Sequence, residues 1–217
     1  MILRRRAGCA RFRAMNTHLR PANLPLVTQA ADGMPRRCFS VSEIEEMVRV
    51  GIIDEDERFE LIGGEVVPMS PKGARHEWIK IELNRFFQRA APDNLAIAPE
   101  TTLRLDSHTF LEPDFCIFRR DLDLAALDGA AVLLAIEVAD SSLNYDKGRK
   151  IGVYAAYGVR EVWVIDAKRA TIWAHRRLGV DGYAEVVEHP AQALVTPMLA
   201  PELAVRLADL GIGPAAS

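Results

Sequence analysis

Two acidic residues and one lysine have types and settings that suit metal-assisted chemistry. Glu137 is the one charged residue in the apolar run 131–138, and burying an unpaired carboxylate is costly, so a partner is required. Asp114 follows Pro113, which stiffens the backbone just before it. Lys150 lies at the edge of the apolar stripe of the next predicted helix, where it can extend its ammonium toward carboxylates. Carboxylates suit Mg²⁺ and an ammonium suits a phosphate oxygen or an activated water, so the set predicts metal-assisted phosphodiester hydrolysis.

Each of the three residues also has a purely structural explanation. Glu137 could form a buried ion pair or face solvent at the strand end. Asp114 could belong to an ordinary Pro-Asp turn, and Lys150 could be a solvated charge on an amphipathic helix. The chemical interpretation therefore requires the three side chains to converge within about 4–6 Å of one point.

The elements that must position these residues follow from periodicity and turn residues. Ser40 and Glu43 form a capping box that begins a helix, and Gly63-Gly64 between two short alternating runs predicts a hairpin. The apolar run that contains Glu137 is typical of a central strand covered on both faces. The predicted elements are a helix over 41–50, hairpin strands at 58–62 and 65–69, a helix over 74–90, strands near 95–98, 101–105, 115–118 and 131–138, a helix over 146–157, strands at 161–165 and 171–175, and weaker strands at 183–188 and 203–207. This order predicts an α/β fold with a mixed sheet flanked by helices.

Composition separates a basic tail from an acidic body. The chain has 217 residues, 49% hydrophobic and 26% charged, which excludes a wholly disordered or fibrous protein. Eight of the 27 basic residues but one of the 30 acidic residues lie in 1–37, so residues 38–217 carry a balance of −10. We interpret 1–37 as a disordered extension, with Met15 or Met34 as alternative starts; a nucleic-acid-binding arm is the other interpretation. Residues 38–211 form the predicted domain, and 212–217 a short C-terminal tail.

The sequence also indicates where in the cell the protein is expected. No apolar run approaches the roughly 20 residues that span a bilayer, and no apolar core follows the first arginines as a secretory signal would require. The three cysteines form no Cys-x-x-Cys pair, which argues against a structural zinc site. The cytoplasm is the expected location.

Three stretches of the chain resemble a known family. They are Phe59–Val66 with Pro68–Pro71, then Glu112-Pro113-Asp114, and Glu137-Val138 through Asp146, Lys150 and Tyr154 to Asp166. The pattern resembles the Pro-Asp…Glu-x-Lys signature of the PD-(D/E)XK, or restriction-endonuclease-like, nuclease superfamily. More narrowly, from about Phe39 to Leu210, the chain is similar to the Uma-type family of bacterial restriction endonucleases.

The resemblance implies a restriction-endonuclease-like core and a Mg²⁺-dependent endonuclease acting on DNA, with Mn²⁺ as a substitute and a homodimer as the expected assembly. Asp114 and Glu137 would bind metal. The position two after Glu137 is Ala139 rather than lysine, and the family takes this role from the following helix, which assigns it to Lys150. Glu60 would be a further metal ligand.

The auxiliary candidates are weaker. His76 matches a family position and could contact phosphate or orient a ligand, and Asp140 is a candidate for an additional ligand. Asp146 and Tyr154 lie in the matching stretch.

The acidic body argues against DNA as a partner unless a local basic cleft forms. The alternative function is therefore a catalytically silent binding or assembly module on the same fold, and hydrolysis of another phosphate ester is a third.

Overall fold

The computed structural model describes residues 37–140 and 146–215. Their first half contains α1 (Val41–Arg49), β1 (Phe59–Ile62), β2 (Glu65–Pro68), α2 (Ala74–Ala90), β3 (Leu95–Pro99), β4 (Leu103–Asp106), β5 (Thr109–Leu111) and β6 (Phe115–Arg119). Their second half contains 3-10 turns η2 (Leu124–Ala126) and η3 (Gly129–Ala131), β7 (Leu134–Ala139), the π-helical turn η4 (Asp146–Lys150), α4 (Ile151–Ala156), β8 (Val162–Asp166), β9 (Thr171–Gly179), β10 (Gly182–Pro190), and 3-10 turns η5 (Pro201–Leu203) and η6 (Leu207–Leu210).

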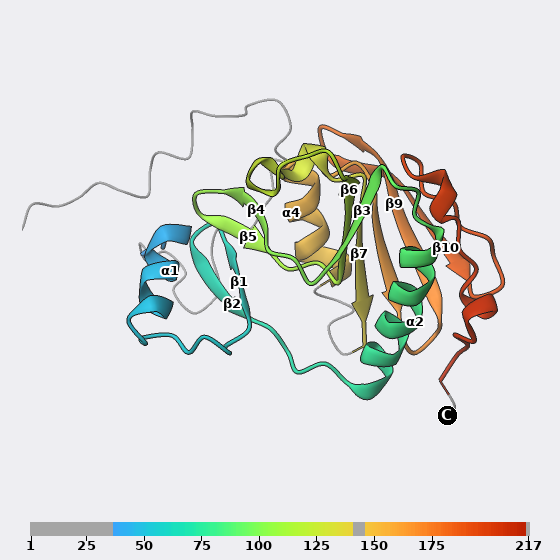
Figure 1. The fold of residues 1–217 in the computed structure, drawn as a ribbon, viewed down its shortest axis with the longest axis horizontal. Helices are drawn as coiled ribbons and strands as arrows, with labels where there is room; N and C mark the ends of the chain where they lie inside the picture. The colour runs from blue at the N-terminus through green and yellow to red at the C-terminus, as the bar shows by residue number, and fades with distance from the viewer. Residues whose placement is uncertain (1–36, 141–145, 216–217) are drawn as a thin grey trace, which may run out of the picture.

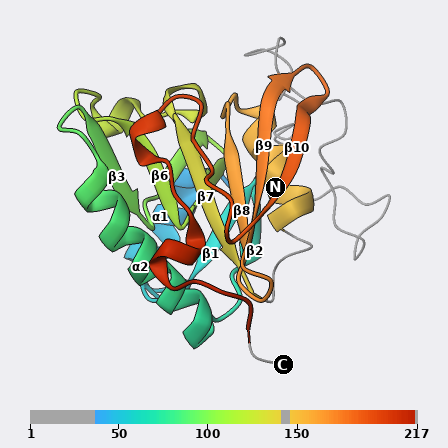
Figure 2. The same ribbon diagram turned by 90° about the vertical axis from the view of Figure 1, so that its right-hand side faces the viewer.

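The strands form two sheets arranged in layers with the helices (Figure 1). A four-stranded sheet has the order β2-β1-β5-β4, and a six-stranded sheet has the order β10-β9-β8-β7-β6-β3. From left to right, Figure 1 shows α1, the small sheet, α4, the large sheet, and α2 with the C-terminal segment. Figure 2 shows α2, η5 and η6 on one face of the large sheet. The predicted mixed sheet flanked by helices is confirmed.

The hairpin that opens the small sheet is the one predicted from Gly63-Gly64. Phe59 pairs with Pro68 and Ile62 with Glu65, leaving the two glycines as the link. Both have positive φ, +60° and +83°, which glycine adopts without steric cost. Gly64 also lies against the segment before α1, where an added Cβ would come within 2.6 Å of the Cys38 Cβ. The predicted capping box of Ser40 and Glu43 is present at the start of α1.

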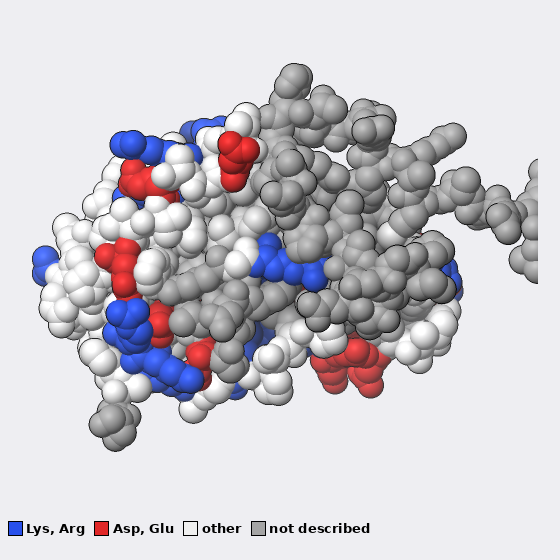
Figure 3. All heavy atoms as spheres, turned by 180° about the vertical axis from the view of Figure 1, so that it is seen from behind, with Lys and Arg blue, Asp and Glu red and all other residues white. Residues whose placement is uncertain are grey.

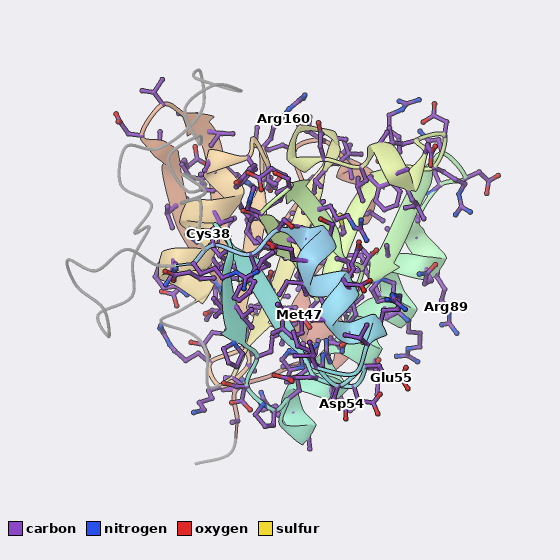
Figure 4. The ribbon with its side chains drawn as sticks, turned by 90° about the vertical axis from the view of Figure 1, so that its left-hand side faces the viewer. Cys38, Met47, Asp54, Glu55, Arg89 and Arg160 are labelled. Atoms are coloured by element: carbon purple, nitrogen blue, oxygen red, sulfur yellow. The ribbon has the colours of Figure 1, made fainter. Side chains whose placement is uncertain are left out.

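Three apolar clusters correspond to the layers. The largest lies between the large sheet and α2 with the C-terminal segment. The second combines Tyr154 of α4, Leu111 of the small sheet and Ala135 of the large sheet, so α4 is packed between the two sheets. The third contains Ile44 of α1 and Leu61 of β1; α1 lies in front of the small sheet in Figure 4, where Met47 is labelled.

The large sheet has one parallel pair of strands, β7 and β8, and β7 contains Glu137. β6 and β7 are antiparallel, whereas β7 and β8 are parallel, with Glu137 opposite Val164. A parallel pair needs a crossover connection, and η4 with α4 lies in this one. The connection therefore brings Lys150 over the strand that holds Glu137.

Some predicted elements differ from the structure. The run 131–138 becomes a strand only at Leu134, because Asp128 caps a 3-10 turn over Gly129–Ala131. Residues 203–207 are not a strand: Pro201 begins a 3-10 turn, a position that suits proline, and Val205 makes an isolated bridge with Val195. The predicted helix over 146–157 divides into η4 and α4. The three-residue strand β5 was not predicted, because it is too short to show a period.

Part of the C-terminal segment packs on the rest of the domain. Ile212 is fully buried, and the Ala215 N–H donates to the Lys168 carbonyl.

Within residues 37–140 and 146–215, no helix has the length and apolar character needed to cross a membrane.

Candidate active site

Strand alternation directs two acids into the layer between the two sheets. In β1, Phe59 and Leu61 face the cluster under α1, so Glu60 points the other way, toward the large sheet, as successive side chains alternate. In β7, Ile136 and Val138 face α2, which leaves Glu137 on the opposite face with Ala135 and Ala139. Glu60 and Glu137 are almost completely buried, at 2% and 4% exposure.

Sheet register brings Asp114 beside Glu137. The pairs Ile117–Leu134, Cys116–Ala135 and Phe115–Ile136 continue by one step to Asp114 and Glu137, and residues directly opposite in an antiparallel pair share a face. The Val138 N–H donates to Asp114 Oδ2 at 2.8 Å, which fixes the Asp114 side chain at this level. The two acids predicted as metal ligands are therefore neighbours.

Lys150 connects the two sheets. Its Nζ lies 2.7 Å from Glu60 Oε1 and 2.9 Å from Glu137 Oε1, and its side chain is 3% exposed. Tyr154, one helical turn further, donates its hydroxyl to Glu137 Oε1, and the Glu112 N–H donates to Glu60 Oε1 at 3.0 Å. Burial, followed by the charge of Glu137, raises the pKa of Tyr154 well above its usual value, so the phenol remains a donor. Glu137 is thus held between an ammonium and a phenol.

Asp114 is held by a separate set of donors. His76 Nε2 lies 3.1 Å from Asp114 Oδ2, and Lys72 Nζ donates to Oδ1 at 3.0 Å. Burial acts to raise the pKa of Asp114, but the hydrogen bond and charge of His76, the charge of Lys72 and the Val138 N–H hold it well below its usual value. Asp114 is therefore ionised at neutral pH, as a cation ligand must be.

These side chains open on one cavity of about 310 Å³ between β1, β7 and the start of α2. Glu60, Asp114, Glu137, Lys150 and His76 all line it. The loop from Met69 to Gly73, which links the hairpin to α2, forms its other wall. The structure thus brings Asp114, Glu137 and Lys150 to the lining of one cavity.

The auxiliary candidates have different outcomes. Asp140 lines the cavity, and its Oδ1 lies 4.0 Å from Lys168 Nζ. Tyr154 contacts Glu137, as above. Asp146 lies in η4, but its side chain is outside the described residues. His175 of β9 is buried with its ring against Tyr183.

The site also contains residues that sequence reasoning missed. Lys72 contacts both Asp114 and Glu100, at 3.0 and 2.5 Å, and Lys80 contacts Glu100 at 2.5 Å. A lysine in the loop Pro71-Lys72-Gly73, between a hairpin and a helix, was the available signal. Glu100 had none, because its place in the site depends on how β3 and β6 pair.

The donor chemistry at this cavity fits a hard divalent cation. Asp114 and Glu137 offer adjacent carboxylates, and Mg²⁺ is usually held by one or two carboxylates with the rest of its shell water. Within the described part of the chain, no group of three or more His, Cys, Asp and Glu side chains forms a ready metal site. Instead, Lys72 and Lys150 neutralise the acids.

The family follows from a sequence comparison. Residues 42–208 match the Uma2 family, whose description is "Putative restriction endonuclease". The chain belongs to the Uma2 family. The resemblance found from the motifs is thereby confirmed, and the match spans the elements from α1 to η6 that build the cavity.

One solved structure supports the fold of this Uma2 member. A crystal structure from Anabaena variabilis, described as "a putative nuclease belonging to DUF820", is similar with a TM-score of 0.60 and 19% identity, covering 79% of this chain and 97% of the other. A second, the cryo-EM structure of the DrdV–DNA complex, has a TM-score of 0.30 and 10% identity over 52% of this chain and 12% of the other, too distant to support any argument. No curated protein matches the chain.

Proposed function

We propose that this Uma2 protein is a metal-dependent endonuclease that hydrolyses phosphodiester bonds in DNA. The observation that carries the proposal is the convergence of Asp114, Glu137 and Lys150 on one cavity. The family description supports nuclease chemistry and DNA as the substrate. Mg²⁺ is the proposed cation, with Mn²⁺ as a substitute.

Each residue has a role that its contacts support. A bound divalent cation supplies a polarised phosphoryl oxygen and a more acidic water. Asp114 and Glu137 bind that cation, and Glu60 is the proposed third acid. Lys150 is held between Glu60 and Glu137, so its charge can stabilise the negative charge that develops on the phosphate.

Two further residues keep the ligands in place. Tyr154 donates to Glu137 Oε1, and His76 lies 3.1 Å from Asp114 Oδ2. Hydrogen bonds of this kind orient the ligands of metal sites, and their loss typically lowers metal affinity or activity. Tyr154 and His76 are therefore positioning residues in the proposal, without a part in bond breaking.

The charge pattern limits how DNA is held. Basic and acidic side chains lie side by side on the described part of the face in Figure 3, and residues 38–217 carry a balance of −10. Phosphate binding would therefore depend on the lysines of the cavity and on the bound cation, because the surrounding surface supplies little net attraction.

A plasmid assay tests the proposal. Supercoiled DNA is incubated with the full chain and Mg²⁺, and nicked and linear products are quantified. Asp114→Asn and Glu137→Gln are expected to lower the rate by at least about 100-fold, whereas Glu202→Gln, on an exposed acid, retains it. Equal activity of the wild type and both site variants, or activity without any divalent cation, contradicts the proposal.

A catalytically silent binding or assembly module is the second candidate. The observation that favours it is that Lys72 and Lys150 already neutralise the acids at the cavity. Titration with Mn²⁺ by calorimetry separates the two candidates. Saturable binding that Glu137→Gln abolishes supports the nuclease, and its absence favours the module.

A further inference from the structure

Lys72 contacts the Asp114 oxygen that the Val138 N–H and His76 do not contact. Asp114 Oδ2 is already bound by the Val138 N–H and His76. Oδ1 receives the Lys72 ammonium at 3.0 Å, and the Lys72 side chain is 14% exposed. A cation and an ammonium cannot share one oxygen closely without strong repulsion, since partial burial reduces screening.

Glu100 offers Lys72 a second place. Its Oε1 lies 2.5 Å from Lys72 Nζ and 2.5 Å from Lys80 Nζ, and 3.3 Å from an Arg58 nitrogen. Burial acts to raise the pKa of Glu100, but Lys72 and Lys80 lower it to about 2, so the carboxylate is ionised. Lys72 can therefore leave Asp114 and still have a partner.

The backbone couples Glu100 to Asp114. Glu100 has φ +49°, a left-handed conformation that is uncommon for residues other than glycine, and its N–H donates to the Asp114 carbonyl at 3.2 Å. Such strain persists only where the surroundings impose it, and it often occurs at functional sites. Here it aims the Glu100 carboxylate at the ammonium that Asp114 holds.

We propose that Lys72 is a built-in competitor of the metal at Asp114, and that Glu100 receives its ammonium when a cation binds. The inference rests on the proposed function, because it needs a cation site at Asp114. In this proposal, the Lys72 ammonium is the positive charge that a cation replaces at Asp114 Oδ1. After displacement, it remains beside the cavity as a second positive charge, in addition to Lys150.

Mn²⁺ affinity of the full chain, measured by calorimetry without DNA, tests this proposal. Lys72→Met is expected to tighten Mn²⁺ binding by roughly tenfold, the loss of one charged competitor. Glu100→Gln is expected to weaken it, because Lys72 then has Asp114 as its main partner. In the Lys72→Met background, Glu100→Gln is expected to have little effect, since it acts through Lys72.

Two control variants separate competition from general electrostatics. Lys80→Met removes an equal charge, whose ion pairs are with Glu77 and Glu100, and it is expected to change affinity far less than Lys72→Met. Lys72→Arg keeps the charge and should keep the competition. Circular dichroism confirms that each variant is folded.

The outcomes distinguish this inference from the proposed function. Equal effects of Lys72→Met and Lys80→Met, or strictly additive effects in the double variant, overturn the competition while leaving the metal site intact. Unchanged affinity of Lys72→Met with Glu137-dependent binding in the wild type does the same. If neither the wild type nor Lys72→Met binds Mn²⁺, both the inference and the proposed function are wrong.

Discussion

At the scale of single residues, the site holds buried acids that are each matched by a donor. Glu137 and Glu60 share Lys150, and Asp114 has His76 and Lys72. Removing one partner of a buried pair leaves an uncompensated charge, which is strongly destabilising. The site is therefore part of the folding core as well as a place for chemistry.

Asp114 predicts a pH dependence of stability. Because its folded pKa lies well below the usual 3.8, the folded protein binds this proton less readily than the unfolded chain. Its contribution is present above the unfolded pKa and is lost as the pH falls through the lower folded pKa. Urea unfolding at about pH 6 and about pH 3 should show a larger difference between wild type and Asp114→Asn at the higher pH. An equal difference at both would contradict the ionised, stabilised Asp114 described here.

The sequence revealed part of this site. Glu137 was visible because it interrupts an apolar run, Asp114 because it follows Pro113, and Lys150 because it lies at the edge of an apolar stripe. Lys72 and Glu100 were not found because their roles depend on contacts across 28 positions of the chain. The position of Lys72 in the loop between the hairpin and the helix was a weak signal that does not name its partners, and Glu100 had no local signal that distinguishes it from a surface charge.

At the scale of elements, α2 shows what local pattern determines. Its predicted range, 74–90, is the observed one. Both signals are local, because the apolar stripe lies in the helix itself and the proline lies two residues beyond its end. The helix over 146–157 differs, with a π-helical turn before α4. That turn ends at Lys150, whose ammonium is held by two acids from different sheets, and the sequence pattern does not contain this tertiary contact.

The hairpin glycines give a prediction at this scale. Gly64→Ala is expected to destabilise the fold by about 2–4 kcal/mol, because the positive φ and the contact of its Cβ with the Cys38 segment both oppose it. Gly63→Ala is the matched control: it has a positive φ but nothing within 4 Å of its Cβ, so about 1–2 kcal/mol is expected. Urea unfolding measures both. A Gly64→Ala cost no larger than that of Gly63→Ala would refute the close approach.

At the scale of the whole molecule, we propose that residues 38–217 contain the complete folded unit, with the domain at 38–211. A chain that begins at residue 38 is expected to fold and to unfold cooperatively in urea, and its transition is compared with that of the full chain. A comparison of the DNA affinity of this shortened chain with that of the full chain tests whether the eight arginines of 1–37 act as a binding arm. A chain that fails to fold would place part of the domain before residue 38.

The edge of the large sheet bears on the proposed homodimer. β10 ends the strand order and exposes Val186 and Val187. An apolar edge strand is a template for pairing with another chain. Light scattering is expected to give twice the mass of the chain, and Val186→Lys is expected to shift the protein toward the monomer. A monomeric wild type would rule out the dimer.

The proposed metal site is tested most directly by the position of Mn²⁺ in a crystal of the full chain, located by its anomalous scattering. A peak is expected in the cavity in contact with both Asp114 and Glu137, and no peak is expected there in crystals of Glu137→Gln. A peak that contacts neither carboxylate, or an occupied cavity that is the same in Glu137→Gln, would contradict it.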